Sequence, residues 1–145
     1  MTNRKQPLPA LGVGLALMTS AVLVGVPAQA TSAERAVVRL ETTLRPSGDS
    51  NGSGEAHFTL NKARKRVCAT VEWRGIQRPD AAHIHRKSDG GIVVDLVGSV
   101  TGGPKCATGV PKATIAKILD SPRRYYFNVH NATYPAGAIQ GTLHR

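Results

Sequence analysis

The sequence is poor in aromatic residues and lacks the short motifs of several common enzyme families. Aromatic residues make up 4% of its 145 residues, and they do not alternate with basic residues as they do in nucleic-acid-binding modules. It contains no Gly-x-Ser-x-Gly elbow, no His-Glu-x-x-His helix and no phosphate-binding glycine loop with a lysine. We therefore expect no nucleic-acid partner, and none of these motifs identifies a catalytic residue.

Long apolar runs are also scarce, because only one is present and it lies at the N-terminus. Arg4 and Lys5 precede this run, which ends at Pro27-Ala28-Gln29-Ala30 with small residues suited to signal cleavage. We predict a signal peptide over residues 1–30 and a single secreted domain over residues 31–145. No later run is long enough to cross a membrane. An uncleaved membrane anchor is the alternative.

Cysteine is limited to two residues, Cys68 and Cys106. In an exported chain, an even pair of cysteines predicts one disulfide, which here would close a loop of 38 residues. Neither cysteine has a neighbour at Cys-x-x-Cys spacing, so a metal site built from these two alone is disfavoured. Two free thiols are the alternative.

Acidic residues are fewer than basic ones, with 9 Asp and Glu against 19 Lys and Arg, for a net charge of +10. Part of the excess is local, in the basic cluster Lys62, Arg64, Lys65 and Arg66. Such a cluster favours anionic surfaces, so an extracellular protein or an anionic envelope component is a candidate partner. The simpler interpretation is a solubilising turn between two strands. The sequence does not predict an oligomeric state.

Short segments with a two-residue period, separated by turn residues, fill the rest of the chain. The alternation is clearest in residues 66–73, where Val67, Ala69 and Val71 share one face. Further strands are expected over residues 36–45, 55–60, 81–86, 92–97, 124–130 and 138–143, and a short helix over residues 112–119. Seven short strands in one domain predict an all-β protein, a two-sheet antiparallel sandwich with one short helix.

Histidines stand out in two of these expected strands. Because side chains alternate along a strand, His83 and His85 share one face, opposite apolar neighbours. Tyr126, Asn128 and His130 share the corresponding face of the strand over residues 124–130. The pattern therefore predicts that three imidazoles can gather on one face of a sheet.

Three neutral imidazoles are suitable ligands for Zn²⁺ or Cu²⁺, with a fourth position open. The hypothesis is a metal site made by His83, His85 and His130, with Asn128 and Tyr126 as supporting residues. The alternative is structural, because imidazoles also order a polar face by hydrogen bonding to neighbours or to the backbone.

Other polar residues near the histidines have less specific interpretations. Asp89 and Asp95 are candidates to orient an imidazole. His57 is a further ligand only if its strand lies beside the others, and His144 is expected to be solvated.

Four segments together resemble the CHRD domain, named for chordin, which is common as a single-domain secreted bacterial protein. The matching segments are residues 80–85 (DAAHIH), 92–97 (IVVDLV), 125–130 (YYFNVH) and 134–143 (YPAGAIQGTL). They occur in the family's order within residues 80–143, and the resemblance as a whole extends from about residue 34 to residue 145. The resemblance implies export and an immunoglobulin-like β-sandwich with Greek-key topology.

The chain departs from the usual family pattern in two places. Arg86 and Lys87 stand where the family usually has a glycine-rich loop, and the glycines follow at Gly90 and Gly91. Ala138 and Gln140 stand where the closing strand usually carries charged residues.

Two functions follow as hypotheses. The first is a secreted binding or structural module without enzymatic activity. The second is a histidine-ligated copper or zinc protein with redox chemistry, similar to the sandwich of the copper–zinc superoxide dismutases.

Overall fold

The computed structural model describes residues 37–96, 98 and 100–145. The predicted signal peptide lies outside these residues. The described part consists mainly of β-strands, with one α-helix and one short 3-10 helix. In chain order the elements are β1 (Val37–Pro46), β2 (Ser53–Asn61), β3 (Arg66–Arg74), β4 (Ala81–Arg86), β5 (Ile92–Asp95), β6 (Lys105–Ala107), α2 (Lys112–Asp120), η1 (Pro122–Arg124), β7 (Tyr125–His130) and β8 (Ile139–Thr142).

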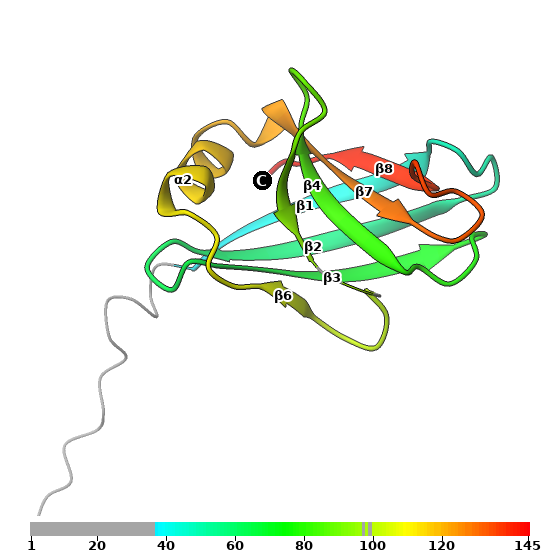
Figure 1. Ribbon diagram of the computed structural model, residues 1–145, viewed down its shortest axis with the longest axis horizontal. Coiled ribbons are helices and arrows are strands. Elements are labelled where there is room, and N and C mark those ends of the chain that lie inside the picture. Colours follow the sequence, from blue (N-terminus) through cyan, green and yellow to red (C-terminus); the bar gives the residue numbers. More distant parts are fainter. Residues whose placement is uncertain (1–36, 97, 99) are drawn as a thin grey trace, which may run out of the picture.

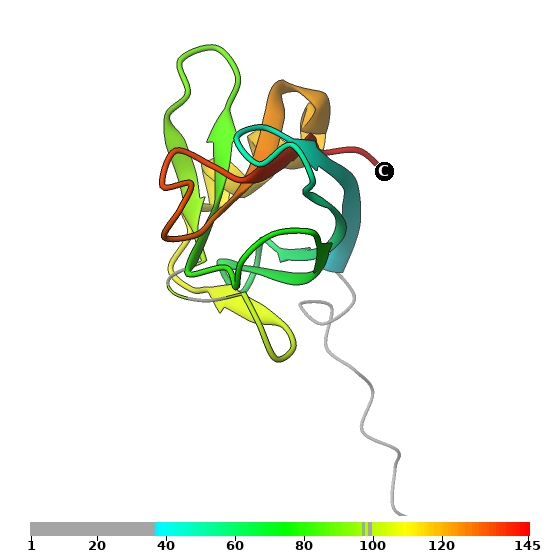
Figure 2. The ribbon, with the colours of Figure 1, turned by 90° about the vertical axis from the view of Figure 1, so that its right-hand side faces the viewer.

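The strands form one antiparallel sheet with the order β5-β4-β7-β8-β1-β2-β3-β6. The two predicted layers are two parts of this sheet, joined along β1, which pairs with both β2 and β8. Seen end-on, the sheet curls around its own interior and is nearly a barrel (Figures 1 and 2). The prediction of an all-β antiparallel fold with one short helix is confirmed, and the sandwich is an approximate description of it.

Alternation of polar and apolar residues explains how the sheet encloses a core. Along β1, Leu40, Thr42 and Leu44 are buried while their neighbours are exposed, as expected for a strand with one face to the interior. Phe58 on β2 and Phe127 on β7 meet edge to face across this interior, with ring centroids 5.0 Å apart. These two parts of the sheet are therefore held together by apolar packing.

The main differences from the predicted elements lie near residue 100. No strand was expected between residues 98 and 111, but this segment contains the three-residue strand β6, which makes eight strands in the described chain. In β6, Cys106 is paired directly with Cys68 of β3, and the predicted disulfide joins them with an S–S distance of 2.06 Å. A strand this short among glycines and prolines carries too little periodic signal to be predicted. The strand expected over residues 92–97 ends earlier, at Asp95.

The helix α2 lies at one end of the sheet (Figure 1) and has two fully buried residues, Ile115 and Ile118. Its bounds agree with the prediction to within one residue. Among the residues placed by the structure, no helix has the length and apolar character needed to cross a membrane.

Candidate functional site

The paired strands β4 and β7 carry the three histidines on one face. In the register of these strands, His83 lies opposite Asn128 and His85 lies opposite Tyr126. The alternate residues, including Ile84 and Phe127, are fully buried. The predicted separation of histidines from core residues is therefore confirmed.

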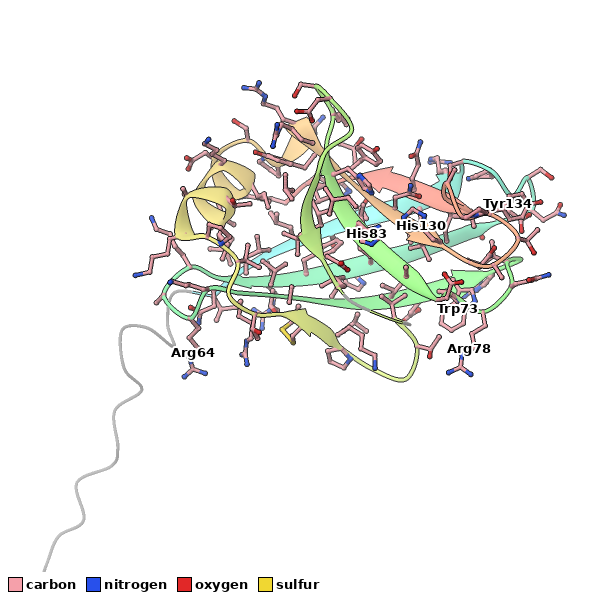
Figure 3. The ribbon with its side chains drawn as sticks, in the orientation of Figure 1. Arg64, Trp73, Arg78, His83, His130 and Tyr134 are labelled. Carbon is pink, nitrogen blue, oxygen red and sulfur yellow. A yellow bond between two sulfur atoms is a disulfide. The ribbon has the colours of Figure 1, made fainter. Side chains whose placement is uncertain are left out.

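The three imidazoles form a compact cluster. One ring nitrogen of each residue lies within 4.8 Å of the chosen nitrogens of the other two. His83 Nδ1 is 3.0 Å from His130 Nε2, and the two side chains lie side by side in Figure 3. His85 and His130 are each only 8% exposed, so the cluster is largely removed from solvent.

Two of the histidines are fixed through their second nitrogen. His85 Nδ1–H donates to the carbonyl oxygen of Gly90 at 2.9 Å, and His130 Nδ1–H donates to that of Pro135 at 3.0 Å. Because a carbonyl only accepts, the proton of each neutral ring resides on Nδ1 and Nε2 carries the lone pair. His85 Nε2 is buried and has no hydrogen-bond partner.

The Gly90 carbonyl is presented by the hairpin between β4 and β5. Gly90 has φ +68°, a conformation that glycine adopts without strain, and its N–H donates to the Arg86 carbonyl. Asp89 is salt-bridged to Arg86 and accepts a hydrogen bond from Gly91 N–H. The glycines that are displaced relative to the family pattern therefore still shape the loop that fixes His85.

The Pro135 carbonyl is presented by the loop between β7 and β8. Asn131 Oδ1 accepts hydrogen bonds from the backbone N–H groups of Thr133 and Tyr134, which folds the loop back toward β7. Gly137 has φ +127°, and a Cβ at this position would lie 2.2 Å from Asn128 Oδ1. Glycine is therefore required by both conformation and space, and the tight loop positions the acceptor for His130.

Burial favours the neutral form of two of the imidazoles by lowering their pKa values. Burial, and then the nearby His130, lower the pKa of His83 below its ordinary value of 6.5, although Asp95 acts in the opposite direction. Burial also lowers the pKa of His130, and its hydrogen bond to the Pro135 carbonyl opposes this. Neutral imidazoles are the form that binds metal ions.

Among the predicted supporting residues, Tyr126 contacts the cluster and Asn128 is tied to a loop. The Tyr126 ring stacks on His85, with centroids 4.9 Å apart and planes at 12°. Asn128 Nδ2 donates to the Ala136 carbonyl, and its buried Oδ1 has no hydrogen-bond partner. Asp95 Oδ1 lies 3.5 Å from His83 Nε2 and is the carboxylate placed to orient that ring.

The other two histidines in the described chain lie outside the cluster. His57, on β2, has its Nδ1 3.8 Å from a carboxylate oxygen of Glu41, and His144 has its Nδ1 3.7 Å from the other oxygen. The strand of His57 therefore does not lie beside β4 or β7, which was the condition for a fourth ligand. We expected His144 to be solvated. It is partly exposed, and it also pairs with Glu41.

The basic cluster forms the exposed turn between β2 and β3. Its members, Lys62, Arg64, Lys65 and Arg66, are all exposed, and Lys65 adopts φ 51°. In Figure 3 Arg64 lies at the end of the molecule, well away from His83 and His130. The turn and the histidine cluster are therefore separate surfaces.

The carbonyl groups of Gly90 and Pro135 are the functional groups that sequence reasoning missed. A backbone carbonyl gives no residue-specific signal, because every residue has one. The available signal was indirect, a glycine-containing turn that follows each histidine strand at short range.

Comparison with protein families gives a match to the family model described as CHRD domain over residues 26–143, most of the chain. Searches of curated proteins and of solved structures gave no match.

Proposed function

Because the chain belongs to the CHRD-domain family, we propose that it is a secreted, non-enzymatic binding module that holds a divalent transition-metal ion. The ligands are His83, His85 and His130, and the ion is Zn²⁺ or Cu²⁺. A CHRD domain is consistent with a non-enzymatic module. Export is supported by the sequence of residues 1–30 and by a disulfide of the kind that persists in oxidising compartments.

The observation that carries this proposal is the pattern of hydrogen bonds around the imidazoles. Histidine ligands of metal ions generally donate their other N–H to a carbonyl or carboxylate, which fixes the ring and the tautomer. His85 and His130 do this through Gly90 and Pro135, and His83 has Asp95 beside its Nε2. A merely polar surface would not require all three second nitrogens to have such neighbours.

The spacing of the nitrogens also suits a small ion. Two ligands at the usual zinc–nitrogen distance in a tetrahedral site are separated by about 3.3 Å. His83 Nδ1 and His130 Nε2, at 3.0 Å, are already close to that separation. The widest pair needs to close by at most about 1.5 Å from the 4.8 Å limit, a shift within reach of side-chain rotation.

His85 Nε2 gives the site a further reason to bind an ion. A buried polar atom without a partner costs about 1–3 kcal/mol. Metal coordination would satisfy this atom, which is buried and unpaired without it. The lone pair of His130 Nε2 also points into the cluster, because the proton of that ring is on Nδ1, and it becomes available once His83 Nδ1 no longer donates to it.

The third ligand, His83, must change its tautomer before it can bind an ion. Without metal, His83 Nδ1–H donates to His130 Nε2, since His130 Nε2 has no proton to give. Coordination through His83 Nδ1 requires this proton to move to Nε2, where Asp95 is placed to accept a hydrogen bond. Binding by neutral imidazoles therefore proceeds without net proton release.

The test is isothermal titration calorimetry of the purified, disulfide-bonded protein after chelator treatment, with Zn²⁺ and Cu²⁺ in separate titrations. We expect one ion per chain with a Kd below about 1 μM, or about −8 kcal/mol. The variants His83→Gln and His85→Gln should each lose at least tenfold in affinity. His57→Gln, which removes an exposed histidine outside the cluster, is the matched control and should bind as the wild type does.

Circular dichroism and thermal unfolding of each variant separate loss of ligand from loss of fold. Binding weaker than about 100 μM, or equal losses in the cluster variants and in His57→Gln, would overturn the proposal. Zinc binding without copper preference would also argue against the redox function, because zinc does not change oxidation state.

A further inference from the structure

A second feature beside the histidine cluster is a groove over β1, β7 and β8. It has a volume of about 680 Å³, and the residues around it include Arg45, Lys87, Tyr126 and Thr142. Tyr126 connects the two features, because its ring stacks on His85 and also lines the groove. The groove does not include any of the three clustered histidines.

The groove lies where the pairing between β1 and β8 is interrupted. The two strands are paired at Arg45 and Gln140 and at Pro46 and Ile139, and an isolated bridge joins Glu41 of β1 to His144, two residues beyond the end of β8. Between these points, within the described chain, no ladder pairing joins Thr43 to Thr142, and both residues line the groove. The sheet surface there presents hydroxyl groups and an amide instead of a continuous apolar layer.

The charges around the groove are of one sign. Arg45 and Lys87 contribute positive charge, and no acidic residue is among the lining residues. Neither cation forms an ion pair within the part of the chain that the structure covers. His144 also lines the groove, but Glu41 lies 3.7 Å from its ring, so we do not count it as a cation. Two cations without an ion pair at one groove attract an anion.

We propose that this groove binds a sugar that carries an oxoanion group, a carboxylate or a sulfate. The planar guanidinium of Arg45 is suited to two parallel hydrogen bonds with such a group, and Lys87 adds a second positive charge. The hydroxyl groups of Thr43 and Thr142 and the amide of Gln140 both donate and accept hydrogen bonds, as sugar hydroxyls require. The proposal does not depend on metal binding by the histidines.

The experiment uses the full, disulfide-bonded chain in buffer with chelator, so that no metal contributes. We would titrate ¹⁵N-labelled protein with trigalacturonate, a sulfated galactose disaccharide, neutral galactotriose and inorganic phosphate, each at physiological salt. We expect saturable binding of an acidic sugar with a Kd below about 1 mM. The amide shifts should be centred on Thr43, Gln140 and Thr142. The two acidic sugars distinguish a carboxylate from a sulfate.

Matched variants distinguish specific binding of the sugar at the groove from nonspecific attraction of an anion to a basic protein. Arg45→Gln with Lys87→Gln should weaken binding of the acidic sugar at least tenfold. Lys62→Gln with Arg66→Gln removes the same charge from the β2–β3 turn and should leave binding unchanged. Equal losses in both double variants, or no saturation by either acidic sugar, would overturn the proposal. Equal affinity for phosphate and for the acidic sugars would overturn the role of the sugar.

Discussion

Replacing Asp95 with asparagine should weaken zinc binding about tenfold, and the reason lies in the proton of His83. In the proposed metal-bound form, His83 coordinates through Nδ1 and carries its proton on Nε2. Asp95 Oδ1, 3.5 Å away, then accepts from that N–H and stabilises both the tautomer and the orientation of the ring. An asparagine keeps the size of the side chain but removes its negative charge.

The magnitude follows from exposure and distance. Loss of a group that orients a metal ligand generally costs between 10-fold and 100-fold in affinity. The Asp95 side chain is 55% exposed and its contact with His83 is long, so solvent weakens the interaction. We therefore expect the lower limit, about tenfold or ~1.4 kcal/mol.

The assay is competitive zinc titration with a fluorescent chelator, which resolves a tenfold change. Asp120→Asn is the control, because Asp120 is an exposed carboxylate at the end of α2, an element that contributes no residue to the histidine cluster. A ¹⁵N spectrum of the imidazoles provides an independent readout: on adding zinc, the His83 proton should move from Nδ1 to Nε2. Unchanged affinity in Asp95→Asn, or a proton that stays on Nδ1 in the zinc complex, would refute this reasoning.

Three further predictions concern stability. Replacing both cysteines with alanine should lower the free energy of unfolding by about 4 kcal/mol, because the 38-residue loop gains freedom in the unfolded chain; urea unfolding measures it. Gly137→Ala should cost roughly 1–3 kcal/mol from backbone strain, plus the clash with Asn128, and should cost more than Gly109→Ala, which meets no neighbour. Metal-free protein should lose stability as the pH falls below 6.5, because the lowered pKa values of His83 and His130 let the unfolded chain bind protons first. Urea unfolding across this range should show a flatter pH dependence in the variant that combines His83→Gln with His130→Gln.

The position of the histidines on one face was predictable because it depends only on strand periodicity. Once residues 81–86 and 125–130 are strands, His83, His85 and His130 must face away from Ile84 and Phe127. The pairing of these two strands was not predictable in the same way. Strand order depends on contacts between segments distant in sequence, which local patterns do not encode.

The fixing of the His85 and His130 rings was beyond sequence reasoning for a different reason. It depends on backbone carbonyls of Gly90 and Pro135, and their direction is set by the local turn conformation. Asn128 illustrates the same limit. It was expected to support the cluster, but its amide donates to the neighbouring loop at Ala136. The residue type indicated that Asn128 would have a polar partner. Only the three-dimensional structure shows that this partner is the Ala136 carbonyl.

The disulfide has a consequence for how molecules of this protein meet one another. The strand order ends in β5 and β6, which have four and three residues, so each outermost strand offers a short row of backbone groups. The strand β6 pairs with Val67–Ala69 of the nine-residue strand β3, and without it this part of β3 would also be an open border on which another chain could add its own strand. The covalent link between Cys68 and Cys106 holds the short cover in place. Reduction would therefore favour self-association, and the disulfide is a safeguard against aggregation.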